Sequence, residues 1–175
     1  MIIMIEIKLP EGVKAEANAS SVTTSGKLGA NTRKFNSSLL NITAGADKII
    51  IDHVKAKKLS DKAANAEKAF SKELANDIKG VCDYYELRMK SVHAHFPITV
   101  EVKCGAISIN NIIGERVPRH AGIAGSTKVE VKGQNVRLYG TSLDDVSQTA
   151  ANIRKACRMK NKDTRVFQDG IYFEV

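Results

Sequence analysis

The chain has 175 residues, of which 43% are hydrophobic and 26% charged, and its formal net charge is +8. These proportions are typical of a folded protein with one domain or two small ones, and they argue against a disordered chain. No stretch approaches the roughly 20 apolar residues that a membrane-spanning helix needs, so we expect a soluble protein.

The first predicted element is a strand that ends before Pro10 and Gly12. Isoleucines and a leucine alternate along residues 3–9, which places them on one face of an extended chain. Glu6 and Lys8 interrupt the apolar start and no positive region precedes it, so we do not interpret it as a secretion signal and expect no export.

Further β-rich runs follow at residues 22–29, 39–43 and 49–54, and a helix is predicted from Ser60. Apolar residues recur along that helix at spacings of four and three until Gly80 loosens its end. They are Ala66, Phe70, Leu74, Ile78 and Val81. This spacing predicts that one side of the helix packs on its own sheet.

The second half repeats this order of strands and then a helix. Strands are predicted over residues 87–95, 98–103, 106–113, 127–131 and 136–139, with a hairpin turn at 132–135. Ser142 followed by Asp145 resembles a capping box at the start of a helix. The predicted buried stripe of that helix is Val146, Thr149 or Ala150, Ile153 and Cys157.

The two halves also resemble each other in sequence. Shifted by 87 residues, Ser60 meets Ser147, residues 63–65 meet 150–152 and residues 68–69 meet 155–156, all with identical amino acids. The β-rich run 48–51 falls on 135–138 in the same register. Two alanine-rich helices could agree by chance, but an internal duplication explains the shared order of elements more economically.

The three cysteines, Cys82, Cys104 and Cys157, have no spacing typical of a disulfide framework or a zinc site. A reducing compartment and structural roles are expected for them. His93 and His95 would share one face of a strand, but two ligands do not make a metal site. No phosphate-binding loop and no set of nucleophile, base and orienting group is present, so we predict no metal, no cofactor, no small-molecule substrate and no enzymatic activity.

Basic residues are concentrated near the end of the chain. They make up six of the twelve residues 154–165, and Asp163 is the only acid among them. Residues 1–87 carry a net charge of +2 and residues 88–175 carry +6. A solvated surface or cations at a helix end would explain part of this pattern. A field concentrated on one half of a molecule, with aromatic residues close by, favours RNA as the partner.

Four segments of the chain form a recognisable set: Met89-Lys-Ser-Val-His-Ala-His-Phe-Pro-Ile98, Asn111-Ile-Ile-Gly-Glu-Arg116, Gln148-Thr-Ala-Ala-Asn-Ile153 and Arg165-Val-Phe-Gln-Asp-Gly-Ile-Tyr172. In order and spacing they resemble the large-subunit ribosomal protein family numbered six in bacteria, and its archaeal and eukaryotic branch fits best. The resemblance covers nearly the whole chain. The chain differs from the family at Ile112 and Ile113, where the family usually has Phe-Leu, and in a more dilute arginine-rich loop.

The resemblance implies an α+β fold made of two tandem copies of a small antiparallel sheet with a packed helix. The boundaries would be residues 1–87, which are nearly neutral, and 88–175, which would bind RNA and include the basic tail. It implies a structural role in the large ribosomal subunit of the cytoplasmic ribosome. The partners would be large-subunit rRNA near the stalk base and sarcin-ricin loop, neighbouring ribosomal proteins, and translation factors close by, with no membrane.

The RNA contacts that the resemblance and the charge pattern predict fall into two groups. One lies in the loop 114–120, and the other in the run 154–165. The predicted contacts are Arg116, Arg119, His120, Arg154, Lys155, Arg158, Lys160, Lys162 and Arg165, with Lys128 and Lys132 as weaker candidates. Phe167 and Tyr172 are expected to anchor the tail in the core more than to stack on bases. A basic adaptor for an acidic protein and a free RNA-binding regulator remain alternative functions.

Overall fold

The computed structural model describes residues 5–45, 48–53, 60–94, 96–103, 105–159, 162–163 and 165–174. The chain divides into two compact units, Met1–Tyr84 and Tyr85–Val175. Each unit has its own helix, its own antiparallel sheets and its own apolar core.

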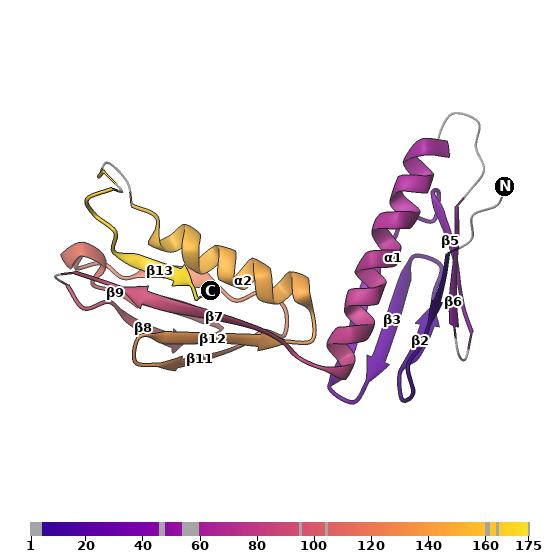
Figure 1. The fold of residues 1–175 in the computed structure, drawn as a ribbon, viewed down its shortest axis with the longest axis horizontal. Coiled ribbons are helices and arrows are strands. Elements are labelled where there is room, and N and C mark those ends of the chain that lie inside the picture. Colours follow the sequence, from indigo (N-terminus) through magenta and orange to yellow (C-terminus); the bar gives the residue numbers. More distant parts are fainter. Residues whose placement is uncertain are drawn as a thin grey trace. The chain divides into compact units, whose positions relative to one another are not determined.

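The first unit contains two three-stranded sheets, in the orders β1-β6-β5 and β2-β3-β4, and the helix α1 packs on both (Figure 1). Its elements are β1 (Ile5–Lys8), β2 (Lys14–Ala17), β3 (Ser21–Gly26), β4 (Gly29–Lys34), β5 (Leu40–Ala44), β6 (Lys48–His53) and α1 (Ser60–Cys82). The apolar stripe of α1 meets Val22, Leu40, Ile49 and Ile51 of the sheets. Burial of such a side chain contributes about 1.5–3 kcal/mol, so this contact holds the layers together.

An ion pair also joins α1 to the second sheet of this unit. Nε of Arg33 on β4 donates to Asp77 at 2.6 Å, and its Nη2 donates to the other carboxylate oxygen at 3.0 Å. Asp77 is buried, and Arg33 also reaches Glu73 at 3.0 Å. A buried carboxylate needs a cationic partner such as this guanidinium, because a buried carboxylate without a partner would strongly destabilise the fold.

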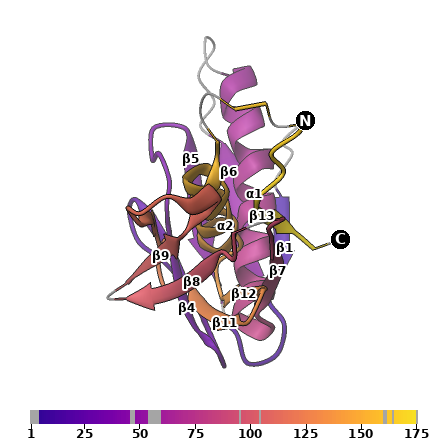
Figure 2. The same cartoon turned by 90° about the vertical axis from the view of Figure 1, so that its left-hand side faces the viewer.

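The second unit has a four-stranded sheet in the order β11-β12-β7-β13 and a three-stranded sheet in the order β10-β9-β8. Its elements are β7 (Tyr85–Val92), β8 (Thr99–Lys103), β9 (Ala106–Asn110), the 3-10 turn η1 (Ile112–Gly114), β10 (Arg119–Gly122), β11 (Lys128–Lys132), β12 (Asn135–Gly140), α2 (Leu143–Cys157) and β13 (Gly170–Phe173). Figure 2 shows β8 and β9 running side by side, as their antiparallel pairing requires.

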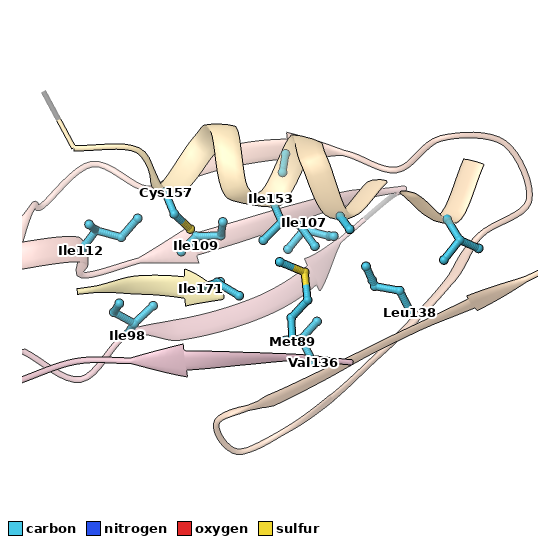
Figure 3. Packing of buried hydrophobic residues seen from close by; sticks show 13 residues of the cluster. Met89, Ile98, Ile107, Ile109, Ile112, Val136, Leu138, Ile153, Cys157 and Ile171 are labelled. Atoms are coloured by element: carbon cyan, nitrogen blue, oxygen red, sulfur yellow. The ribbon is translucent and has the colours of Figure 1, made fainter. Parts of the chain in front are cut away.

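The core of the second unit lies between α2 and the strands. The predicted stripe of α2 is buried in full, including Ile153 and Cys157. These side chains meet Met89, Leu138 and Ile171 from the four-stranded sheet and Ile107 and Ile109 from β9 (Figure 3). The Ser142 hydroxyl accepts a hydrogen bond from the backbone N–H of Asp145 at 3.3 Å, which confirms the predicted cap at the start of α2.

The two units share one strand topology, which agrees with the predicted duplication. The order β1-β6-β5 of the first unit corresponds to β7-β12-β11, and β2-β3-β4 corresponds to β8-β9-β10. The 87-residue shift places β6 on β12 residue for residue. The expected α+β class with tandem copies is confirmed, although each copy has two small sheets where one was expected. The strand β13 has no counterpart in the described residues of the first unit.

Several predicted strands differ from the observed ones. The prediction of a strand over residues 106–113 is wrong at its end, because the chain turns after Asn110 into η1. Asn111 and Ile113 have φ angles of 61° and 49°, which no strand accommodates. β2, β4, β10 and β13 were not predicted as separate strands, since they are short and rich in polar residues or glycine.

Candidate nucleic-acid interface

Three of the predicted RNA contacts form a basic ridge at the C-terminal end of α2, consisting of Arg154 and Lys155 in its last turn and Arg158 at its C-cap. All three residues are exposed, whereas their neighbours Ile153 and Cys157 are buried. For Arg154 and Lys155 this division follows from helical periodicity, because the apolar stripe faces the sheets and these two positions lie on the other side. The α2 ridge therefore concentrates three cations at the C-terminal end of one helix.

A groove lies on each side of the α2 ridge. The β13 groove has a volume of about 540 Å³ and lies between α2 and residues 167–172. The β10 groove has a volume of about 610 Å³ and lies between α2 and residues 119–122. Lys155 and Arg158 line both grooves, so a phosphate chain in either one would meet the same cations.

Polar contacts fix the position of α2 beside β10. The side-chain amide of Asn152 donates to the carbonyl of Gly122 at 2.9 Å. The hydroxyl of Thr149, which is buried, accepts from the backbone N–H of Ala124 at 3.0 Å. These contacts explain why part of the motif Gln148–Ile153 faces the strands and does not face a partner.

Arg119 lies on β10 and not in a loop as predicted, and its guanidinium is fully engaged within the protein. Its Nη1 donates to the carbonyls of Ala156 and Arg158, each at 2.9 Å. Its Nε donates to Glu115 at 2.7 Å, and this hydrogen bonding lowers the pKa of the Glu115 carboxyl and raises the pKa of Arg119. Arg119 therefore caps the C-terminal end of α2, where a cation is favoured by the helix dipole.

The other predicted contacts of the 114–132 region are not all near the α2 ridge. Arg116 is exposed in the turn after η1, and His120 is exposed on β10 and lines the β10 groove. Lys128 is exposed on β11 and pairs in register with Tyr139, on the sheet face opposite the buried Leu138. Lys128, and Lys132 on the same face, therefore lie across the sheet from α2.

Beyond α2, Lys162 and Arg165 are exposed, and Lys160 lies outside the described residues. The side chain of Arg165 is 89% exposed and forms an ion pair with Asp163 at 3.1 Å. Hydrogen bonds from Arg165 lower the pKa of the Asp163 carboxyl. An exposed pair of this kind is weak, so the Arg165 guanidinium can exchange Asp163 for a phosphate at little cost.

Aromatic residues of the C-terminal motif lie on the surface and not in the core. Phe167 and Tyr172 are 38% and 43% exposed, so the expectation that they anchor the tail is wrong. Ile171, between them in chain order, is 1% exposed and provides the anchor. The sequence reasoning also missed Phe173, whose ring lies 5.9 Å from the Arg154 guanidinium.

The described residues hold no group of three or more His, Cys, Asp and Glu side chains that could bind a metal. Burial raises the pKa of the Cys157 thiol to about 11, so this cysteine is a neutral core residue. His95 and Cys104 lie outside the described residues. Within the part of the chain that the structure describes, neither helix has the length and apolar character needed to span a membrane.

Comparison with known proteins gives a consistent result. The profile of the family described as Ribosomal protein L6 matches residues 96–170. The chain is 41% identical to the large ribosomal subunit protein uL6 of Methanobrevibacter smithii, over 95% of this chain and 92% of that protein. It is 39% identical to the protein of the same name from Methanocella arvoryzae, over 95% and 93%. A structural protein family of this kind agrees with the prediction that the chain is not an enzyme. The chain belongs to the ribosomal protein L6 family.

Proposed function

We propose that the protein is a structural component of the large ribosomal subunit and that its second unit binds large-subunit rRNA through the α2 ridge. Family membership supports the ribosomal role, because the relatives are named as large-subunit proteins. The observation that carries the RNA interface is the exposed α2 ridge between two grooves. The sequence positions of these cations alone would not distinguish an RNA-binding ridge from a helix end that is merely solvated.

Comparison of the two copies supports assigning the RNA interface to the second unit. Under the 87-residue shift, Lys155 corresponds to Lys68, but Arg154 corresponds to the buried Glu67 and Arg158 to Ser71. At the three positions of the ridge, the second copy therefore carries three cations and the first carries one. A duplicated scaffold does not require this difference, so we attribute it to a polyanionic partner of the second copy.

The interface acts by neutralising phosphates and releasing their counterions. Each arginine can donate two parallel hydrogen bonds to one phosphate, and lysine contributes a point charge, so Arg154 and Arg158 set orientation more than Lys155. Arg119 acts indirectly, because its bond to the Arg158 carbonyl fixes the backbone from which that side chain extends. Lys162, Arg165, Arg116 and His120 add contacts around the two grooves.

The location within the ribosome belongs to the same proposal. The resemblance implies a position near the stalk base and the sarcin-ricin loop of cytoplasmic ribosomes, beside other ribosomal proteins and close to bound translation factors. Lys128 and Lys132 lie across the sheet from α2, so we assign them to a second RNA segment or a neighbouring protein. The nearly neutral first unit is then available for protein neighbours.

The test compares the full chain with the triple variant Arg154→Ala, Arg158→Ala, Arg165→Ala in binding to a transcript of archaeal large-subunit rRNA across a salt series. Loss of three phosphate contacts should lower the slope of log affinity against log salt by about 2–3. The matched control is Lys68→Ala, Lys72→Ala, Lys79→Ala, which removes three exposed cations from α1. An unchanged affinity of the first triple, or an equal loss in both, would contradict the placement of the interface.

A further inference from the structure

Exposed aromatic rings are concentrated in residues 167–173, the segment that forms one wall of the β13 groove. The chain has nine phenylalanines and tyrosines, and three of them lie within residues 167–173. Phe167, Tyr172 and Phe173 are each about two-fifths exposed. A folded protein with few aromatic residues gains more by burying such rings than by leaving them in water. Two of these rings, those of Phe167 and Tyr172, line the β13 groove, and their exposure therefore indicates a surface that is covered by a ligand.

The ring of Tyr172 is held in place before any ligand binds. Its hydroxyl donates to the carbonyl of Gln168 at 3.1 Å. A Cβ at Gly170 would lie 3.3 Å from this ring. Because glycine has no side chain, the Tyr172 ring can pack directly against the backbone at Gly170. Asp169 ties the same segment to the chain just after β7 by accepting from the backbone N–H of Ala94 at 3.0 Å. A ring fixed in this way loses little rotational entropy when a planar group stacks on it.

The opposite wall of the groove carries the cations of the α2 ridge. Cys157 and Ile171, both buried and neutral, line the groove between the two walls. Lys162 lies beside the aromatic wall, with its Nζ 5.4 Å from the centre of the Phe167 ring. The volume of about 540 Å³ is within the range of small-molecule sites, about 300–1,000 Å³. One wall therefore suits a planar ring and the other suits phosphates.

We infer that the β13 groove binds an unpaired nucleotide of the RNA, with its base stacked on the Tyr172 and Phe167 rings and its flanking phosphates on the α2 ridge. This inference rests on the proposed function. A base within an A-form duplex has its faces covered by its neighbours, whereas a base in a loop or bulge can stack on a protein ring. The groove thus selects a single-stranded feature, which the cations alone could not distinguish from a duplex.

An acidic protein segment is the alternative occupant of the β13 groove. The two occupants differ in how strongly their binding depends on the aromatic rings. A base presents its π-face to the aromatic wall, so replacing the rings by leucine removes stacking and leaves the apolar contact. An acidic peptide would depend on the cations and tolerate leucine.

The experiment uses the full-length variant Phe167→Leu, Tyr172→Leu and the same rRNA transcript and salt series. Loss of one stacked base should weaken binding about 10- to 100-fold. The salt slope should stay unchanged, because no cation has been removed. The matched control is Phe96→Leu, which replaces a ring in the same unit that is 44% exposed and lies outside the β13 groove. The control should bind within about twofold of the wild type.

Ultraviolet cross-linking gives a second, independent measurement on the wild-type complex. We expect the nucleotide adduct on the peptide that contains residues 165–174. An adduct confined to other peptides, or a double leucine variant that keeps wild-type affinity, would overturn the inference while leaving the proposed function intact. Failure of the wild-type protein to bind the transcript would instead refute the proposed function. Circular dichroism melts of both variants must match the wild type, and Tyr172→Phe, which keeps a ring, should retain affinity within about threefold.

Discussion

Arg119 provides a direct test of the structural role assigned to it, through the substitution Arg119→Ala. The substitution removes a charged donor from two carbonyls at the end of α2, those of Ala156 and Arg158. The first of these bonds is partly buried and contributes about 1.5 kcal/mol, and the second is exposed and contributes about 0.5 kcal/mol. We therefore expect the free energy of opening α2 to fall by about 2 kcal/mol.

Hydrogen exchange followed by mass spectrometry measures this effect in one unit at a time. A loss of about 2 kcal/mol corresponds to roughly 30-fold faster exchange for peptides from α2. Peptides from α1 should exchange at the wild-type rate, which provides an internal reference. Arg116→Ala, an exposed arginine three residues earlier, is the matched control and should change stability by less than about 0.5 kcal/mol. Wild-type exchange in α2 of Arg119→Ala would refute the capping role.

Three further predictions concern other contacts. Ser142→Ala should lower the stability of the second unit by about 1 kcal/mol in urea unfolding, because the cap to the Asp145 N–H is lost; no change would mean that water replaces it. Asp77→Ala should cost about 3–5 kcal/mol in the first unit, since Arg33 loses its buried partner, and urea unfolding with wild-type stability would contradict this. Hydrogen bonds from arginines lower the pKa of Glu86 from 4.5 to about 2, so its stabilising effect is complete above pH 4.5 and is lost as pH falls toward 2. Glu86→Gln should therefore be less stable than wild type at pH 6 and converge with it in urea unfolding below pH 3; a constant difference across this range would contradict the ion pairing.

The parts of the fold that follow from periodicity were predictable from the sequence. The stripes of both helices, the start of α2 and the pairing of β11 with β12 depend on residues close together in the chain. β10 and β13 were not predictable in this way. β13 pairs with β7 across some eighty residues, with Ile171 opposite Ser91, and no local pattern encodes such a contact. Its four residues, with a glycine at the start, are also too few for a clear alternation.

The candidate site was predictable in its charge but not in its geometry. The run 154–165 identified the cations, yet the sequence could not separate Arg119 from Arg116. Arg119 donates to carbonyls at the end of α2, whereas Arg116 is exposed in a turn. Which of the two arginines is engaged depends on how β10 packs beside α2. The same limit applied to Phe167 and Tyr172, because apolar character alone favours burial. On β13 the inward position is taken by Ile171, and its neighbour Tyr172 is exposed.

The position of β13 in the chain has a consequence for protein synthesis. A ribosome makes the chain from its amino end, so β7, β8, β9, β10, β11, β12 and α2 all leave the exit tunnel before residues 167–173 do. Until then the outer edge of β7 is unpaired, and the aromatic wall of the β13 groove does not exist. A nascent or prematurely terminated chain would therefore present the cations of α2 without the rings beside them. Discrimination among RNA sites would begin only when this segment has been translated.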